Sequence, residues 1–202
     1  IKITSFADLL NPALKGKIAF GDPANSSSAF QCLMAMLYSN GKNGDPMSPQ
    51  AWAYVDNFIK NLDGKLLNSS GAVHKGAADG EYTVGLTWED PAATYVKNGA
   101  NVAVVFPAEG AIFPGESVQI IKGAKHMENA KKFVDFMLSK KIQEEAGKTL
   151  TVRPLRKGVA LADYMTPQDT IKVVPNYDEG WVSEYKKEIV AEWNKHLENS
   201  RQ

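Results

Sequence analysis

The chain has 202 residues, of which 44% are hydrophobic and 23% are charged, as is usual for a soluble globular protein. Its 23 basic residues balance its 23 acidic ones, so no net charge attracts it to nucleic acid or to an anionic membrane. The single cysteine, Cys32, excludes an internal disulfide and a cysteine-rich zinc site. Because it lies in an apolar run, we expect an unreactive core thiol.

The spacing of apolar residues predicts an α/β fold in which strands alternate with helices, forming a parallel or mixed sheet covered by helices. Strands are expected at 17–21, 82–88 and 102–106, with an exposed edge strand at 117–121. Helices are expected at 28–39, 49–63, 71–79, 91–97, 126–148 and 179–197. A stretch of about 20 apolar residues, as a membrane span requires, is missing, so no membrane insertion is predicted. The start at Ile1 without signal-peptide features indicates a mature chain or a piece of a longer one.

A hydroxyl-rich turn, Ser26, Ser27 and Ser28, separates the first predicted strand from the first predicted helix. The first N–H groups of a helix lack internal partners and carry partial positive charge, so they can hold a phosphate or a carboxylate. Serine is also the ordinary residue for capping a helix, and a purely structural role explains the turn equally well. The sequence therefore leaves both an anion site and a simple N-cap open.

Two further polar segments adjoin predicted helices. Asn68, Ser69 and Ser70 precede a helix that carries His74. Trp88, Glu89 and Asp90 follow the strand 82–88, where ligands gather in open α/β sheets. Together with the serine turn, these segments form a set that could bind an anionic group at one end and hydroxyls or an amine at the other. Two alternatives stay open: Glu89 or Asp90 only caps the following helix, and His74 lies on the surface without contacting a ligand.

Other motifs that carry chemistry are missing from the sequence. His74, His126 and His196 lie far apart, without the spacing of metal ligands, so neither a metal nor another cofactor is predicted. Neither a nucleophile elbow, nor a phosphate-binding loop, nor a dinucleotide fingerprint occurs. Arg153 and Arg156 could each make bidentate hydrogen bonds to a phosphate, although ion pairing at the surface explains them as well.

The order of several segments resembles the ferric-iron, phosphonate and sugar-phosphate branch of bacterial ABC-importer periplasmic solute-binding proteins. The segments that carry this resemblance are Phe6–Pro12, Lys15–Ile18, Asp22–Ala24, Ala78–Thr87, Lys122–His126, Ala130–Phe136 and Ser139–Lys140. The resemblance implies a type II periplasmic-binding fold with one lobe and part of the other, in a chain lacking the N-terminal part. It implies that residues 1–106 and 170–202 form the second lobe and that 107–169 cross to the first lobe, packing on the absent part.

The same resemblance implies a non-enzymatic, monomeric receptor in the periplasm, or anchored outside the cell by a lipid, that delivers its ligand to an ABC permease. Iron-binding members carry adjacent tyrosines where this chain has Trp88, Glu89, Asp90 and Pro91. The resemblance thus favours a sugar phosphate or a phosphonate, held by the serines, Asn68, His74 and the Trp88–Asp90 segment. Three alternatives stay open: an iron carrier using carboxylates and an anion, an enzyme on phosphate esters with Glu89 or Asp90 as base and His74 as acid, and a ligand-sensing receptor module.

Overall fold

A computed structural model describes residues 1–115 and 117–201 and divides the chain into two compact units. The first unit comprises Ile1–Phe113 and Asp169–Gln202, and the second comprises Pro114–Gln168. The predicted divisions followed residues 106 and 169, whereas these units divide after Phe113 and Gln168. The assignment of the two parts to particular lobes stays a prediction.

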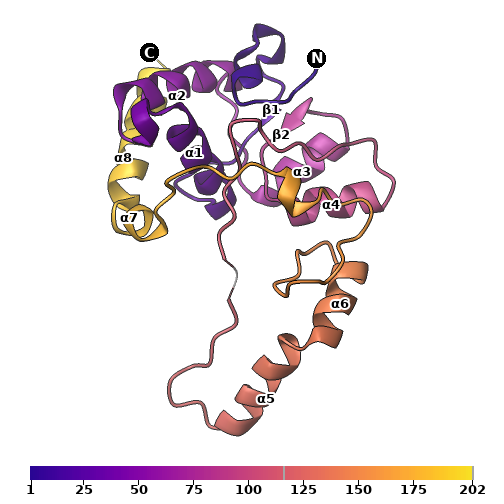
Figure 1. The fold of residues 1–202 in the computed structure, drawn as a ribbon. Coiled ribbons are helices and arrows are strands. Elements are labelled where there is room, and N and C mark those ends of the chain that lie inside the picture. The colour runs from indigo at the N-terminus through magenta and orange to yellow at the C-terminus, as the bar shows by residue number, and fades with distance from the viewer. Residues whose placement is uncertain (116, 202) are drawn as a thin grey trace. The chain divides into compact units, whose positions relative to one another are not determined.

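The first unit is built on a small parallel sheet (Figure 1). Strand β1, Ile18–Ala19, pairs with β2, Val84–Gly85, so that Ile18 lies opposite Val84. An isolated parallel bridge between Gly21 and Leu67 adds a third segment on the other side of β1. The sheet is smaller than predicted, because only two residues of the expected strand 82–88 pair as a strand.

Helices surround this sheet and supply most of the core. Capping explains their ends: Ser48 accepts a hydrogen bond from Ala51 N at the start of α2, and Asp63 ends that helix in the left-handed conformation. The helices of the first unit are α1 Ser27–Asn40, α2 Pro49–Leu62, α3 Ser70–Ala78, α4 Glu89–Lys97, α7 Glu179–Glu184 and α8 Lys186–Asn199, with short 3-10 turns at Ala7–Leu10, Pro12–Leu14 and Lys42–Gly44. A further 3-10 turn, Gln168–Thr170, begins at the last residue of the second unit. The predicted helices 28–39 and 49–63 are confirmed as α1 and α2.

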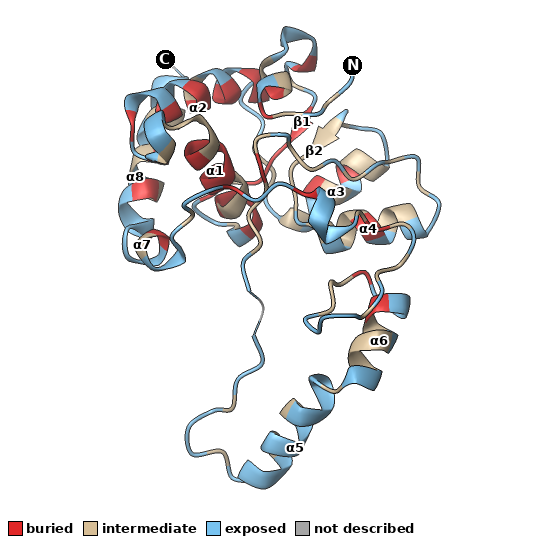
Figure 2. Cartoon of the chain, viewed as in Figure 1, coloured by how far each residue is buried: buried red, intermediate tan, exposed pale blue. Residues whose placement is uncertain are grey.

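The core joins the first strand to the last helix. Phe20 packs edge-on against Phe58 of α2 at 5.2 Å and against Trp193 of α8 at 5.9 Å between ring centroids. All three rings are fully buried, and Figure 2 shows the concentration of buried residues on α1 and α2. Cys32 of α1 packs against this core, and burial raises the pKa of its thiol to about 12, as expected for an unreactive cysteine.

The C-terminal helix is also attached by a polar cluster. The imidazole of His196 stacks on the indole of Trp52 at 4.8 Å between centroids. Its Nδ1 lies 2.6 Å from Oδ1 of Asp56 on α2, and its Nε2 lies 3.2 Å from Oε1 of Glu192. His196 therefore has a structural role in holding α8 against α2, and the predicted single helix 179–197 is divided at Tyr185 into α7 and α8.

The second unit contains α5, Met127–Met137, and α6, Lys140–Thr149. The prediction of one long helix at 126–148 was wrong, because Ser139 has extended backbone angles and caps α6 by accepting a hydrogen bond from Ile142 N. The expected buried stripe was wrong as well: Phe133 is 56% exposed, and no residue of α5 is buried. The residues of that stripe were Ala130, Phe133, Val134, Met137 and Leu138.

Two predicted strands, 102–106 and 117–121, are absent from the described part of the chain. Val105 is 50% exposed, so 102–106 is not the buried strand that was predicted, and 117–121 does not pair as the exposed edge strand that was predicted. Residues with high strand propensity form a strand only where a neighbouring strand offers hydrogen-bond partners and packing. The sequence pattern shows that these residues favour a strand, but it does not show which segment they would pair with.

Candidate functional site

Parallel pairing brings the three predicted polar segments to one edge of the small sheet. The serine turn follows Gly21, the Asn68–Ser70 segment follows Leu67, and the Trp88–Asp90 segment follows β2. The pairing is hydrogen-bonded, with Leu67 N 2.9 Å from Phe20 O and Leu86 N 3.0 Å from Ala19 O. Because the strands run in one direction, all three segments leave at the carboxyl edge, where α/β proteins place their ligands.

Asp22 fixes the loop between β1 and α1. Its Oδ1 accepts hydrogen bonds from Ala24 N at 3.0 Å and from Trp193 Nε1 at 3.2 Å. Its Oδ2 accepts a hydrogen bond from Asn25 Nδ2 at 2.7 Å. Asp22 thus couples the loop to the core through α8 and acts as a positioning residue. Sequence reasoning missed this role, and the only local signal was an aspartate at the start of a turn.

The three serines have different environments. Ser26 is the N-cap of α1, and its hydroxyl accepts a hydrogen bond from Ala29 N at 3.3 Å. Ser28 is buried, with its Oγ 3.1 Å from Oγ of Ser26. Ser27 is exposed in the first turn of the helix. Of the three, Ser27 therefore has the hydroxyl most open to an incoming ligand, together with the amides of the first turn.

The start of α3 repeats this arrangement. Ser69 caps the helix by accepting a hydrogen bond from Ala72 N at 3.1 Å; Asn68 and Ser69 are exposed, and Ser70 is half-buried. Nδ1 of His74 is buried without a hydrogen-bond partner among the described residues. Burial lowers the pKa of this imidazole, which favours its neutral form. His74 can then offer an anion a hydrogen bond rather than a full positive charge.

The third segment opens α4. The helix begins at Glu89, two residues before the predicted start, so Glu89 and Asp90 lie in its first turn. Carboxylates at this position stabilise a helix through its dipole. Trp88 is the N-cap residue without a side-chain capping bond, and its indole is 53% exposed. The segment therefore presents an aromatic surface beside two acidic groups.

A depression of about 560 Å³ lies in the first unit between two of these segments. Its lining residues are Asp22, Asn25, Ser26, Leu66, Leu67, Asn68, Leu197 and Arg201. The structure thus brings Ser26 and Asn68 together. The other predicted site residues do not line this depression: Ser27, Ser28, Ser69, Ser70, His74, Trp88, Glu89 and Asp90. Sequence reasoning missed Arg201, because an isolated arginine near a chain end carries no pattern.

The other two arginines lie in the second unit and bind backbone carbonyls. Arg153 Nη2 donates to Thr166 O at 2.8 Å, and Arg156 Nη1 donates to Leu138 O at 3.0 Å. These bonds indicate a role in loop structure. Over residues 1–115 and 117–201, His, Cys, Asp and Glu side chains do not gather in groups of three or more that could hold a metal ion. Within the same residues, no helix is both long enough and apolar enough to cross a bilayer.

Comparison with known structures identifies the fold. The chain superposes on the periplasmic binding protein AfuA from Actinobacillus pleuropneumoniae, solved with exogenous fructose-6-phosphate bound, with a TM-score of 0.77 and 28% sequence identity. The match covers 98% of this chain and 61% of that chain. The fold is therefore the type II periplasmic-binding fold, as the sequence predicted.

Sequence comparison places the chain in a family. The model for the bacterial extracellular solute-binding protein family matches residues 2–173, so the chain belongs to this family. The spermidine/putrescine-binding periplasmic protein of Escherichia coli is 31% identical over 150 residues, covering 73% of this chain and 41% of that protein. An uncharacterized protein of Haemophilus influenzae is 29% identical over 189 residues, covering 92% and 53%. The chain spans about half the length of the curated relatives it matches.

Proposed function

We propose that this chain belongs to the solute-binding component of an ABC importer and captures a small phosphorylated organic anion, either a sugar phosphate or a phosphonate. In this proposal the protein is a non-enzymatic receptor in the periplasm, or lipid-anchored outside the cell, and passes its ligand to a permease. The observation that carries the proposal is that α1, α3 and α4 all begin at the carboxyl edge of one parallel sheet.

The starts of α1 and α3 favour an anionic group, because their first amides lack partners within the helix and their dipoles leave positive charge there, whereas the first turn of α4 already carries Glu89 and Asp90. The exposed Ser27 hydroxyl adds a donor at α1, and Ser70 adds one at α3. Glu89 and Asp90 would accept hydrogen bonds from the hydroxyls of a sugar, and Trp88 would supply an apolar wall. The sugar phosphate named for the AfuA structure agrees with this chemistry.

A polyamine is the second ligand class that a specific observation favours. Spermidine and putrescine are cations, and the E. coli relative named for them is 31% identical over 150 residues. Glu89 and Asp90 could pair with an ammonium group, and the exposed indole of Trp88 could pack on it. A phosphorylated anion would depend on the starts of α1 and α3, whereas a polyamine would depend on the Trp88–Asp90 segment.

Titration calorimetry tests the proposal with fructose 6-phosphate, 2-aminoethylphosphonate, inorganic phosphate, spermidine and ferric iron. We expect a sugar phosphate or a phosphonate to bind, and Ser27→Ala to weaken its binding about tenfold or more, because a hydrogen bond to a charged group is lost. Ser183→Ala, an exposed serine of α7, serves as the control and should bind unchanged. Tight binding of spermidine alone would contradict the proposal and indicate a polyamine receptor. Binding of iron with a visible charge-transfer band would contradict it and indicate an iron carrier.

Ser26→Ala should act on stability instead. Because Ser26 caps α1 and also contacts the buried Ser28, its loss should lower the free energy of unfolding by about 1 kcal/mol. Ser27→Ala removes neither the N-cap nor the contact with Ser28, so this variant should unfold at the same urea concentration as the parent chain. Equal unfolding midpoints for the two variants would contradict the different roles assigned to these neighbouring serines.

A further inference from the structure

The depression in the first unit contains a cationic side chain, Arg201, which follows the helix α8. The tertiary structure places it in one lining with Ser26 and Asn68, two residues that are distant from it in sequence. A guanidinium is always charged in proteins, and its parallel N–H groups match two oxygens of a phosphate. Arg201 therefore adds a full positive charge to an edge of the sheet where the helix starts carry only partial charges.

The charge of Arg201 is available to a ligand. Arg201 is exposed, and among the carboxylates that the structure describes none forms an ion pair with its guanidinium. Asp22 also lines the depression, but its two oxygens already accept three hydrogen bonds, from Ala24 N, Asn25 Nδ2 and Trp193 Nε1. These donors offset the negative charge of Asp22, so it opposes an incoming anion less than a free carboxylate would.

The remaining lining of the depression suits an ion pair with a small organic ligand. Leu66, Leu67 and Leu197 belong to it, and each is half-buried. Apolar walls lower the effective dielectric, so opposite charges attract more strongly beside them than in open water. The side-chain amide of Asn68 offers two further N–H donors. The volume of about 560 Å³ lies within the range of about 300–1,000 Å³ that is typical of ligand pockets.

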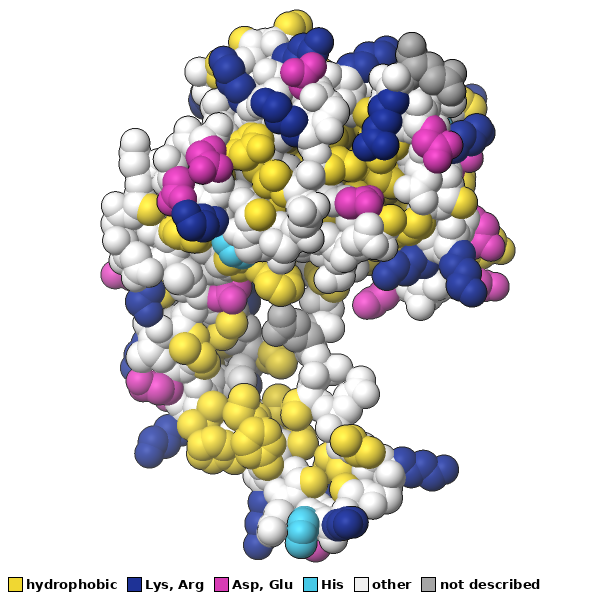
Figure 3. Space-filling view, turned by 180° about the vertical axis from the view of Figure 1, so that it is seen from behind, with side chains coloured by type: hydrophobic (Ala, Val, Ile, Leu, Met, Phe, Trp, Pro, Cys, Tyr) yellow, Lys and Arg dark blue, Asp and Glu magenta, His cyan; other side chains and the backbone are white. Residues whose placement is uncertain are grey.

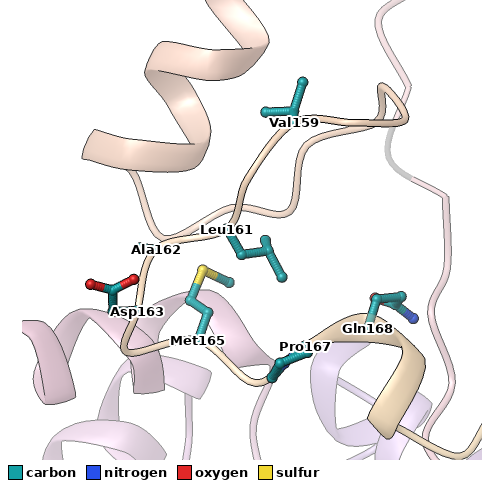
Figure 4. A pocket seen from close by; sticks show the side chains of 7 residues that line it. All are labelled: Val159, Leu161, Ala162, Asp163, Met165, Pro167 and Gln168. Carbon is teal, nitrogen blue, oxygen red and sulfur yellow. The ribbon is translucent and has the colours of Figure 1, made fainter.

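The depression of the second unit does not suit an anion. Its volume is about 510 Å³, and it is lined by Val159, Leu161, Ala162, Asp163, Met165, Pro167 and Gln168 (Figure 4). Five of these seven residues are apolar, and Asp163 carries a negative charge. An anion there would lose its water without meeting a cation, which costs free energy. Of these two depressions, the one with Arg201 is therefore the one suited to a phosphorylated ligand.

Broad surface charge does not explain how an anion would be attracted to the first unit. Figure 3 shows Lys and Arg side chains interspersed with Asp and Glu side chains over the face of this unit that it presents. The field of such a surface is weak at a distance, because opposite charges cancel and salt screens them. Attraction therefore depends on a local cation, which Arg201 supplies.

We propose that Arg201 is a specificity-determining residue of this receptor: its guanidinium binds the phosphate or phosphonate group of the ligand and repels polyamines. This inference rests on the proposed function and adds to it the cation that selects the ligand class. Ser27 directly follows Ser26 of the lining, so Ser27 and Arg201 contact the same anionic group. A fixed positive charge opposes a cationic ligand at the same place, which gives the site its preference.

Titration calorimetry of the 202-residue chain tests the proposal with fructose 6-phosphate, 2-aminoethylphosphonate and spermidine. We expect Arg201→Gln to weaken binding of the phosphorylated ligand about tenfold or more, because charge-assisted hydrogen bonds are lost. Arg201→Lys should retain part of the affinity, since an ammonium keeps the charge but lacks the fork. Arg201→Glu should bind spermidine more tightly than the parent chain does, because repulsion of the cation becomes attraction.

Lys195→Gln is the matched control on α8, because its ammonium is already paired, with Nζ 3.0 Å from Oε1 of Glu192. This variant should bind every ligand like the parent chain. A role of Arg201 in stabilising the end of α8 alone would lower the urea midpoint without changing the preference between phosphate and spermidine, and would overturn the proposal. Unchanged phosphate binding by Arg201→Gln, with binding weakened by Ser27→Ala, would overturn this inference and leave the proposed function intact. Failure of the parent chain to bind either phosphorylated ligand would overturn both.

Discussion

Ser27→Asp should abolish binding of a phosphorylated ligand, with a loss of at least about a hundredfold in affinity. A carboxylate in the first turn of α1 would lie where the phosphate is proposed to bind. Two like charges about 4–6 Å apart repel by roughly 3 kcal/mol at the effective dielectric of a protein surface. The helix itself should be slightly more stable, because a negative charge near its N-terminus favours the dipole. Calorimetry measures the affinity, and urea denaturation measures the stability.

The same variant separates the two ligand classes. A polyamine should bind Ser27→Asp as well as or better than the parent chain, because the new charge is attractive to a cation. Ser183→Asp places an equal charge on the exposed surface of α7 and should leave both ligands unaffected. Retained binding of a sugar phosphate by Ser27→Asp would remove α1 from the proposed site.

Trp193→Ala should be the most destabilising single change in the first unit, lowering the free energy of unfolding by about 3–5 kcal/mol. The indole is fully buried, packs edge-on against Phe20, and donates a hydrogen bond to Asp22. Its removal leaves a cavity and takes away one of the two hydrogen bonds that Oδ1 of Asp22, the residue that holds the serine loop, accepts. A loss of this size is a large share of the stability of a typical domain, about 5–15 kcal/mol.

One further variant separates the contribution of the hydrogen bond from that of ring packing, and a second serves as a control. Trp193→Phe keeps an aromatic ring but loses the bond to Asp22 Oδ1, so it should cost less than the alanine variant while loosening the loop before α1. Trp88→Ala is the control, because this indole is 53% exposed and its removal should change stability little. Urea denaturation followed by circular dichroism measures all three. Equal midpoints for the alanine variants at positions 193 and 88 would contradict the core described above.

Local chemistry explains the elements that were predicted well. Ser26 and Ser48 have side chains that satisfy the free amides of a helix start, and Asp63 with the following glycine can leave the helical conformation at low cost. These choices depend on neighbours within one turn, so they can be read from the chain alone. The fold class was accessible for a related reason, since the order of such segments resembles a known family.

Long-range partners explain the failures. The stripe on α5 predicts burial, but burial requires a second surface, which the sequence of the helix does not specify. The strand predicted at 102–106 lacks a paired neighbour in the described chain. The structural roles of Asp22 and the position of Arg201 depend on contacts with α8 or with distant loops, across more than 100 residues of sequence.

The amino-acid sequence by itself determined the helix starts, the α/β class and the polar segments from which a ligand site could be built, and its resemblance to a known family indicated the type II periplasmic-binding fold. Only the tertiary structure decided that these segments leave one edge of a parallel sheet, that Asp22 is tied to Trp193, and that Ser27 differs from its neighbours in exposure. The physical reason is range: capping and helical periodicity act over a few residues, whereas pairing and packing join parts of the chain that are distant in sequence.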